Sequence, residues 1–268
     1  IDNRINLVFD WYKRNNYDLI GVISTEGVGG EMQKFGNIAS MKSVGFEISL
    51  STVNIRAKDF KWETNFIYSH ARNGVTDLQT VERVIDLVSG NGFAQEGYPV
   101  RSIFSIPFEG LNSEGLPTFR DQDGNVSVSG IYFQESDPEK LKFLEFSGSA
   151  DPTDVGSLGN VFTWKNFKLN VFMTFSFGNV IRMDPVFSSR YDDLSSMPRE
   201  FANRWMVAGD EAKTDIPVIA SIWQNKMDSQ LSYAYNAYNY STARIADGGF
   251  IRMKEISLSY DFPKAVTE

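Results

Sequence analysis

The sequence predicts an all-β fold, and the order of its connections favours antiparallel strands of a large membrane-spanning barrel. The first observation is the alternation of apolar and polar residues, clearest in Phe167–Phe177 and broken there only by Phe172. Successive side chains of a strand point to opposite faces, so this segment has one apolar and one polar side. Its eleven residues are also about what a tilted strand needs to cross a bilayer. The second observation is that short and long connections alternate along the chain.

Four further segments repeat the alternation. In chain order, their apolar sides carry Ile5, Leu7, Phe9 and Trp11; Val44, Phe46, Ile48 and Leu50; Phe60, Trp62, Phe66 and Tyr68; and Ile256, Leu258, Tyr260 and Phe262. The opposite sides are mainly Glu, Asp, Lys, Asn and Ser. A polar side meets bulk water in a soluble two-layer protein and a wet lumen in a membrane barrel, so periodicity alone leaves both open.

The connections between these segments fall into two classes of length. Short ones cover residues 55–59, 165–166 and 263–264, and long ones cover residues 15–41, 73–156 and 178–248. If strands alternate in direction, all short turns lie at one end, and the 73–156 excursion contains either zero or two crossings. Short periplasmic turns opposite long extracellular loops are typical of outer-membrane barrels. A soluble sandwich has no reason to sort its loops in this way.

Aromatic residues lie beside the short turns, where an interfacial belt is expected. They are Phe60, Trp62, Trp164, Phe167, Tyr260 and Phe262. Ordinary core or edge aromatics are the alternative interpretation.

Composition limits the function classes. The 268 residues suffice for one large all-β domain or two ordinary ones, and a net charge of −8 argues against nucleic acid as a partner. The absence of cysteine removes disulfides and thiolate zinc sites, and no apolar run is long enough for a transmembrane helix. Because the chain opens inside a strand pattern without a starting Met, we expect an internal piece of a longer protein.

The sequence offers no convincing catalytic or cofactor site. The only histidine, His70, has no second His or Cys with which to build a zinc site, and a structural role is favoured. Residues 121–125 lack the late ligands of a calcium loop, which favours a hairpin turn. The glycines of residues 27–30 lack the βαβ unit of a dinucleotide site. We therefore expect no enzyme activity, no metal and no cofactor.

Two acidic groups are candidates for the acid pair of a glycosidase. Asp192–Asp193 form one, and Glu135, Asp137 and Glu139 form the other. Glycoside hydrolysis needs two carboxylates held about 5–9.5 Å apart in a groove. Solvated charge in polar loops is the favoured interpretation of both groups.

Aromatic side chains in the last long connection are the candidate ligand contacts. They are Trp223, Tyr233, Tyr235, Tyr238 and Tyr240. Sugar rings stack on aromatic faces, and exposed aromatics in loops are otherwise unfavourable. Packing among the loops or against a partner explains them equally well. In the same connection, residues 191–206 are expected to be helical after Pro198, with Phe201, Trp205 and Met206 at helical spacing.

Strand parity also predicts which side chains face the lumen of a barrel. These are Asn6, Asp10, Glu47, Glu63, Asn65, Lys168, Asn170 and Glu255.

Four stretches resemble the C-terminal part of the barrel in SusC/RagA-type TonB-dependent outer-membrane transporters. They are residues 3–13 with 18–20, residues 36–37 with 43–50, residues 159–169, and residues 250–264. Residues 159–169 match the family pattern G-x-x-N-x-F-x-Y-K-x-F-x-L, with Trp164 at the usual Tyr position. Residues 250–264 are close to Y-L-R-L-K-x-I-S-L-S-Y-x-L-P-K, and Gly97, Gly110 and Gly115 fit the family's loop between the strands.

The resemblance implies a multi-pass protein of the Gram-negative outer membrane. Its barrel would have 22 strands around a plug. It would import oligosaccharides or peptides with energy from TonB, under a SusD-like surface lipoprotein. Residues 1–268 would be a partial barrel domain without the plug, the early strands and the closing strands. The alternative from another class is a soluble, secreted carbohydrate-binding β-sandwich that uses the tyrosine cluster as a sugar platform.

Overall fold

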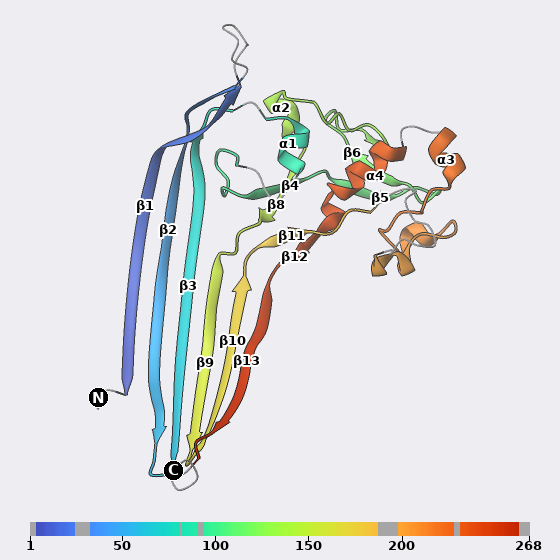
Figure 1. Ribbon diagram of the computed structural model, residues 1–268. Helices are drawn as coiled ribbons and strands as arrows, with labels where there is room; N and C mark the ends of the chain where they lie inside the picture. Colours follow the sequence, from blue (N-terminus) through green and yellow to red (C-terminus); the bar gives the residue numbers. More distant parts are fainter. Residues whose placement is uncertain are drawn as a thin grey trace.

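A long antiparallel sheet carries a smaller domain of loops, helices and short strands at one of its ends (Figure 1). The computed structural model describes residues 4–24, 33–80, 82–89, 94–186, 198–227 and 231–262. Three segments discussed above, residues 27–30, 192–193 and 263–264, lie outside the described residues.

The sheet has six strands in the order β1-β2-β3-β9-β10-β13. Their bounds are β1 Ile5–Ser24, β2 Gln33–Arg56, β3 Phe60–Leu78, β9 Asp154–Trp164, β10 Phe167–Phe177 and β13 Phe250–Tyr260. Every neighbouring pair is antiparallel, which confirms the predicted all-β class. Strand β3 pairs directly with β9, so the excursion between them contains no crossing. The six described strands form an open sheet and do not close into a barrel.

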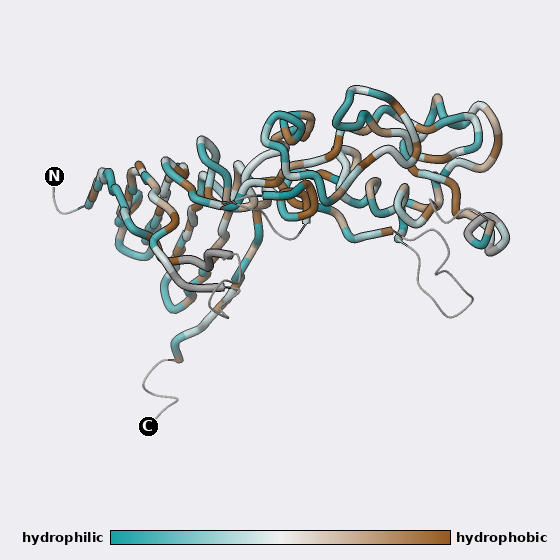
Figure 2. The backbone as a smooth tube through the Cα atoms, turned by 90° about the horizontal axis from the view of Figure 1, so that it is seen from above, coloured by the Kyte–Doolittle hydropathy of each residue, from teal (hydrophilic) through white to brown (hydrophobic). Residues whose placement is uncertain are grey.

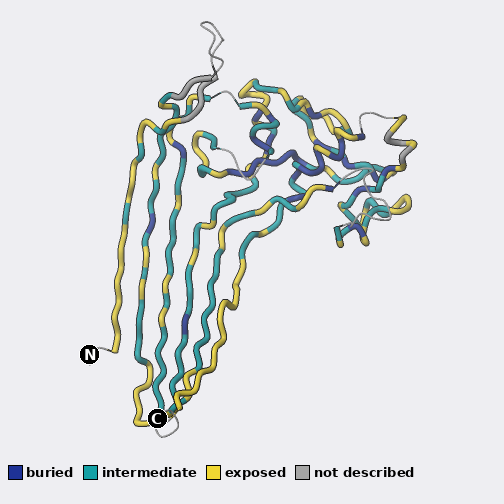
Figure 3. The backbone as a smooth tube through the Cα atoms, in the orientation of Figure 1, coloured by how far each residue is buried: buried dark blue, intermediate teal, exposed yellow. Residues whose placement is uncertain are grey.

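The two faces of the sheet differ in polarity. Residues directly opposite each other in a ladder lie on the same face, so the register joins the apolar side of each strand to that of its neighbour. Across the sheet Phe9 pairs with Ile48 and Ile48 with Tyr68, while Val171 pairs with Ile256. Many of these apolar side chains are exposed, for example Trp11 at 62% and Leu258 at 69%. The described residues therefore place no second layer over the apolar face, and the few buried positions gather mainly in the loop region (Figure 3).

The short turns join strands at the end remote from the loops, as predicted (Figure 1). The β2–β3 turn is closed by a hydrogen bond of 2.8 Å from the amide of Ala57 to the carbonyl of Phe60. In the β9–β10 turn, Lys165 has a φ of 50°, the left-handed conformation that a two-residue hairpin turn requires. Aromatic rings line this end, with Trp164 stacked on Phe167 at 6.3 Å between centroids and Phe167 4.7 Å from Tyr260.

The expectation of a long loop over residues 15–41 is wrong. Strand β1 continues to Ser24 and β2 begins at Gln33. The pairing shifts register between Asn16 and Leu19, and Asp18 there has a φ of 54°. The alternation that marks a strand is lost beyond this irregularity, so the sequence pattern ends before the strand does.

The loop domain contains short elements from all long connections after β3. The strands are β4 Ser102–Ser105, β5 Phe108–Leu111, β6 Pro117–Arg120, β7 Val126–Ser127, β8 Glu145–Ser149, β11 Val180–Arg182 and β12 Ile245–Asp247. The α-helices are α1 Val84–Val88, α2 Pro138–Leu141, α3 Ile222–Met227 and α4 Leu231–Asn239, and the 3-10 helices are Arg199–Asn203, Asp210–Ala212 and Thr242–Arg244. No helix in the described part of the chain is both long and apolar enough to cross a membrane.

A buried core holds the loop domain together, in contrast to the single-layered sheet. Val84, Ile106, Phe119 and Val186 are fully buried in it, and Phe201 is 1% exposed. Seen along the strands, the domain extends to one side of the sheet (Figure 2). The helix expected after Pro198 is only the 3-10 segment Arg199–Asn203, because Arg204 is already extended and the amide of the next residue, Trp205, bonds to the carbonyl of Ile216.

Candidate functional site: the polar sheet face and the loop domain

All eight residues predicted to face a lumen lie on one face of the sheet. Asn6 pairs with Ser51, which pairs in turn with Asn65. Val161 of β9 pairs with Glu63 on one side and with Asn170 on the other. Asp10 pairs with Glu47, and Glu255 pairs with Phe172 of β10. Strand alternation places Lys168 beside Asn170 on this same face.

This face carries charges of both signs. The ammonium of Lys61 lies 2.7 Å from a carboxylate oxygen of Glu63, and Ser257 donates a hydrogen bond of 2.7 Å to Glu255. Such a surface is compatible with water and with polar solutes. That it lines a lumen stays a prediction.

One cluster of polar side chains on the apolar face is held together by its own hydrogen bonds. His70 Nδ1 lies 2.8 Å from Asp154 Oδ1, the same oxygen that accepts a hydrogen bond of 2.5 Å from Tyr68. Thr153 donates to the other oxygen of Asp154 at 2.5 Å. The structural interpretation of His70 agrees with these contacts.

The acidic groups in the loop domain hold turns and helix ends. Asp121 Oδ1 accepts the amides of Asp123 and Asn125, which confirms a hairpin turn between β6 and β7. Asp137 caps α2 by accepting the amide of Glu139 at 3.0 Å. Glu139 itself pairs with Lys142 at 2.7 Å, and Glu135 accepts the amides of residues 136 and 137.

The candidate ligand-binding aromatics divide into buried and exposed ones. Tyr235 and Tyr238 belong to α4 and are 2% and 1% exposed, so the packing alternative describes them. Tyr233 on the same helix is 55% exposed, and Trp223 in α3 is 75% exposed. Tyr240 is half-buried, with its ring 6.2 Å from that of Phe133. Of the five aromatics expected in loops, Tyr233, Tyr235 and Tyr238 lie in α4, Trp223 lies in α3, and Tyr240 directly follows α4. The buried face of α4 is formed by Leu231, Ala234, Tyr235 and Tyr238 at helical spacing.

A buried arginine, Arg244, and a half-buried one, Arg182, tie the core of the loop domain together, and the sequence analysis predicts a role for neither. Arg244 pairs with Glu200 at 2.6 Å, donates to the carbonyl of Asp184, and lies over the ring of Tyr238. Arg182 donates to the carbonyl of Phe104 at 2.8 Å. Burial lowers the pKa of Arg182 to about 10, and burial raises the pKa of Tyr238 to about 12.

A cavity of about 310 Å³ lies at the junction between the sheet and the loop domain. Its wall includes Arg72 and Asn73 from β3, Phe146 and Ser149 from β8, and Asp151. Asp151 forms an ion pair of 2.6 Å with Arg101.

The chain is similar in sequence and in fold to known receptors and transporters. No family model matches the chain. The chain is 24% identical over 98% of its length to TonB-dependent receptor P3 of Formosa agariphila, and 26% identical over 94% to TonB-dependent receptor P26 of the same bacterium. Among solved structures, it superposes on the RagAB peptide transporter with a TM-score of 0.70 and 20% identity over 99% of this chain. A structure of the RagAB peptide importer in the open-open state gives a TM-score of 0.69 with 18% identity over the whole chain.

The resemblance to SusC/RagA-type TonB-dependent transporters is confirmed. It holds in sequence and in fold over nearly the full length of the chain. The chain spans about a quarter of these proteins, namely 26% and 25% of the two receptors and 28% and 27% of the two structures. The open sheet is thus similar to one part of a TonB-dependent transporter barrel.

Proposed function

We propose that this chain forms part of the barrel of a TonB-dependent, SusC-like transporter that imports a nutrient across the Gram-negative outer membrane. Residues 1–268 act in this proposal as a partial barrel domain, and TonB supplies the energy through parts of the transporter outside this chain. A SusD-like surface lipoprotein covers the loop domain. The cargo is an oligosaccharide or a peptide.

One observation carries the proposal: among the residues that the structure describes, no protein layer covers the apolar face of the six-stranded sheet. Exposed apolar surface of this extent is unfavourable in water, whereas lipid covers it at no cost. The opposite face holds the eight polar residues assigned to the lumen, and all described loop elements lie beyond one end of the strands. A carbohydrate-binding sandwich needs a second sheet on the apolar face, and the described residues provide none. The receptors and transporters among the relatives support a role without catalysis.

Within this function, the exposed aromatics of the loop domain are the proposed ligand contacts. Trp223 and Tyr233 present their rings to the outside, and Tyr240 is partly accessible. Tyr235 and Tyr238 contribute through packing and hold α4 in place. Aromatic faces suit either sugar rings or apolar peptide side chains, so this geometry leaves both cargo classes in the proposal.

Growth of the bacterium tests this proposal. The gene for the whole transporter is deleted, and growth is measured on single oligosaccharides and on peptide mixtures as the only carbon source. Loss of growth on one class, restored by the intact gene but not in cells lacking TonB, is the expected result. Growth unchanged on every nutrient, or a soluble location of the protein after cell fractionation, would contradict the proposal.

The partner and the aromatic contacts are tested in the same strain. The transporter is purified with a tag from outer membranes, and a co-purifying lipoprotein is identified by mass spectrometry. Trp223→Ala with Tyr233→Ala is expected to lower uptake while protein level stays normal, because both side chains are exposed. Lys142→Ala, an exposed position of the loop domain outside α3 and α4, is the matched control. Equal uptake by both variants would remove these aromatics from the ligand site.

A further inference from the structure

Three cations lie on the apolar face of the sheet, at the end of the strands that carries the loop domain. Lys13 pairs with Val44 and Val44 with Arg72, so both cations share the face of Phe46, two residues along β2. Lys42 belongs to the same face, because it lies two residues before Val44. All three cations are exposed. They therefore stand on the side of the sheet that lipid is proposed to cover.

The register brings these cations close enough to share one ligand. Lys13 and Arg72 lie in one row two strands apart, which separates their backbones by about 10 Å. Lys42 is on the strand between them and diagonal to both, a relation that leaves Cβ atoms about 7–8 Å apart. Lysine and arginine side chains are long, so three charged ends from these positions can meet on one phosphate group.

No acid neutralises the three cations among the residues that the structure describes. None of the ion pairs there involves Lys13, Lys42 or Arg72. Of the acids in the sheet, Asp77 and Asp154 lie nearest on this face by register. Asp154 is already held by the polar cluster described above, and Asp77 forms no ion pair. The positive charge is thus open to an anionic ligand.

The distance from the short turns places the cations at the far boundary of a bilayer. Arg72 follows Trp62 by ten residues on β3, and both lie on the apolar face. Ten residues span about 33 Å of strand, or roughly 25 Å along the membrane normal at a tilt of about 40°. The apolar band of a membrane barrel is about 25 Å tall. With Trp62 at one boundary, Arg72 lies at the other, and Trp11 beside Lys13, 62% exposed, suits the second aromatic girdle.

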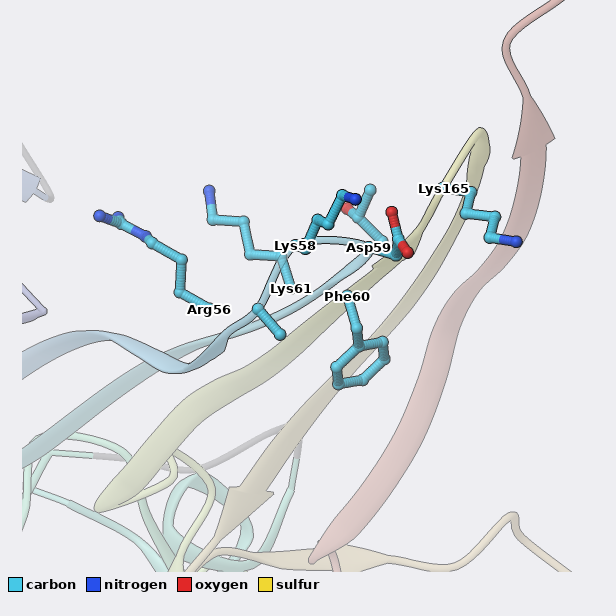
Figure 4. A pocket seen from close by; sticks show the side chains of 8 residues that line it. Arg56, Lys58, Asp59, Phe60, Lys61 and Lys165 are labelled. Atoms are coloured by element: carbon cyan, nitrogen blue, oxygen red, sulfur yellow. The ribbon is translucent and has the colours of Figure 1, made fainter.

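The cations at the short-turn end of the sheet are oriented differently. Arg56, Lys58, Lys61 and Lys165 line a pocket of about 380 Å³ there (Figure 4). Lys61 pairs with Arg56 on one side and with Thr163 on the other, so Arg56 and Lys61 belong to the polar face. An acyl chain has no lipid-covered surface beside them. Of the two groups, the cluster at the loop end is the one that joins positive charge to the lipid-facing side.

We propose that Lys13, Lys42 and Arg72 bind the phosphate of a glycolipid in the outer leaflet, with its acyl chains along the apolar face over Trp11 and Phe46. Lipid A, which forms this leaflet of the outer membrane, carries phosphate on its sugar headgroup, and a guanidinium and two ammonium groups match such an anion. A soluble anion would match the charges but gain nothing from the exposed apolar rows beside them. The proposal rests on the proposed function, because that function places the loop domain outside the cell.

The test uses the full-length transporter, purified from outer membranes and reconstituted in nanodiscs. Native mass spectrometry measures retention of lipid A against dephosphorylated lipid A for the wild type and for Lys13→Gln/Lys42→Gln/Arg72→Gln. We expect the wild type to retain the phosphorylated form preferentially, and each cation removed to weaken this preference roughly fivefold. If the triple variant does not assemble, Lys42→Gln alone gives the same test with a fivefold loss.

The charge-matched control is Arg14→Gln/Lys168→Gln/Arg252→Gln. These three cations are exposed like the others but lie on the polar face, opposite Ser43, Thr163 and Thr174. The control removes the same total charge and should keep the full preference for phosphorylated lipid A. An equal loss in both triple variants would mean that overall charge, not a site on the apolar face, attracts the lipid.

Three other results would overturn the inference. Two are equal retention of the two lipid forms by the wild type, and an unchanged preference in Lys13→Gln/Lys42→Gln/Arg72→Gln. The third is displacement of lipid A by an equal concentration of glucosamine 1-phosphate, which has the phosphate but no acyl chain, because it would assign the cations to a soluble anion. A transporter that is absent from the outer membrane refutes the proposed function, whereas one that is present but shows no preference refutes only the lipid site.

Discussion

Trp62 and Asn160 are joined across β3 and β9 by a hydrogen bond of 3.0 Å from the indole Nε1 to Oδ1. The same oxygen accepts the hydroxyl of Thr64 at 2.8 Å, and Thr64 accepts the side-chain amide of Asn54 at 2.6 Å. This chain of polar groups lies on the apolar face. An unpartnered donor is costly in lipid, so the network explains how an Asn is tolerated there.

Replacement of Asn160 by Leu should destabilise the barrel although it makes the face more apolar. The indole N–H of Trp62 and the hydroxyl of Thr64 lose their acceptor, at a cost of about 1–3 kcal/mol. Urea unfolding of the full-length protein in lipid vesicles measures the change. Asn65→Ala on the polar face is the control and should stay within about 0.5 kcal/mol. Equal stability of the two variants would contradict the role of the network.

Arginine substitutions at two neighbouring positions of β10 should have opposite effects on assembly, because the two side chains lie on different faces of the sheet. Val171 is on the apolar face and Asn170 on the polar face. We expect Val171→Arg to lose assembly, because a lipid-facing Arg near the midplane costs about 2–4 kcal/mol. Asn170→Arg should assemble normally, as judged by heat-modifiable mobility of the outer-membrane protein. A spin label at Asn170 that reports contact with lipid would reverse the assignment of faces.

Arg244 should control the rigidity of the loop domain without affecting the sheet. The Arg244→Met change leaves Glu200 without its partner and the carbonyl of Asp184 without a donor. We expect a loss of roughly 2–4 kcal/mol, because the remaining carboxylate is partly exposed. Limited proteolysis should then cleave within residues 178–248 while the strands stay protected. Arg252→Met, on an exposed position of β13, serves as the control, and equal cleavage of both variants would argue against this role.

The strands of the sheet are readily predicted from the sequence. The two faces differ in polarity, and successive side chains alternate between them, so apolar residues recur at every second position. Strand β10 has the same limits as the predicted segment Phe167–Phe177, and the turn at residues 165–166 sits where Trp164 and Phe167 meet. The upper parts of β1 and β2 were missed because Asn15, Asn16 and Asp18 interrupt the pattern at a register shift. Backbone pairing persists there while side-chain alternation does not.

The loop domain was harder to predict because its core is assembled from distant segments. Phe119, Phe201 and Tyr238 pack in one core, although they lie in three different elements. The sequence does contain a pattern that predicts α4, since Leu231, Ala234, Tyr235 and Tyr238 follow helical spacing. The tyrosines instead suggested a ligand-binding cluster, because tyrosine rings are typical of sugar sites. The approach of Lys58 to Lys165 could not be predicted locally, because only the pairing of Phe60 with Trp164 brings their two turns together.

Tyr238 should make the loop domain lose stability in alkaline solution. Burial raises its pKa from about 10 to about 12 in the folded protein. Below pH 10 the hydroxyl is neutral in both states, so its contribution is fully present there. Between pH 10 and pH 12 the unfolded chain ionises and the folded protein does not, which removes about 1 kcal/mol by pH 11.

The difference between the wild type and Tyr238→Phe isolates this effect. Arg182, whose pKa burial lowers to about 10, acts in the opposite direction in both proteins and therefore cancels in the comparison. Thermal unfolding of the full-length protein, followed by near-ultraviolet circular dichroism at pH 9 and pH 11, measures the two stabilities. We expect Tyr238→Phe to gain about 1 kcal/mol relative to the wild type between these pH values. A constant difference would mean that Tyr238 ionises as readily in the folded protein as in the unfolded chain, and so reaches water.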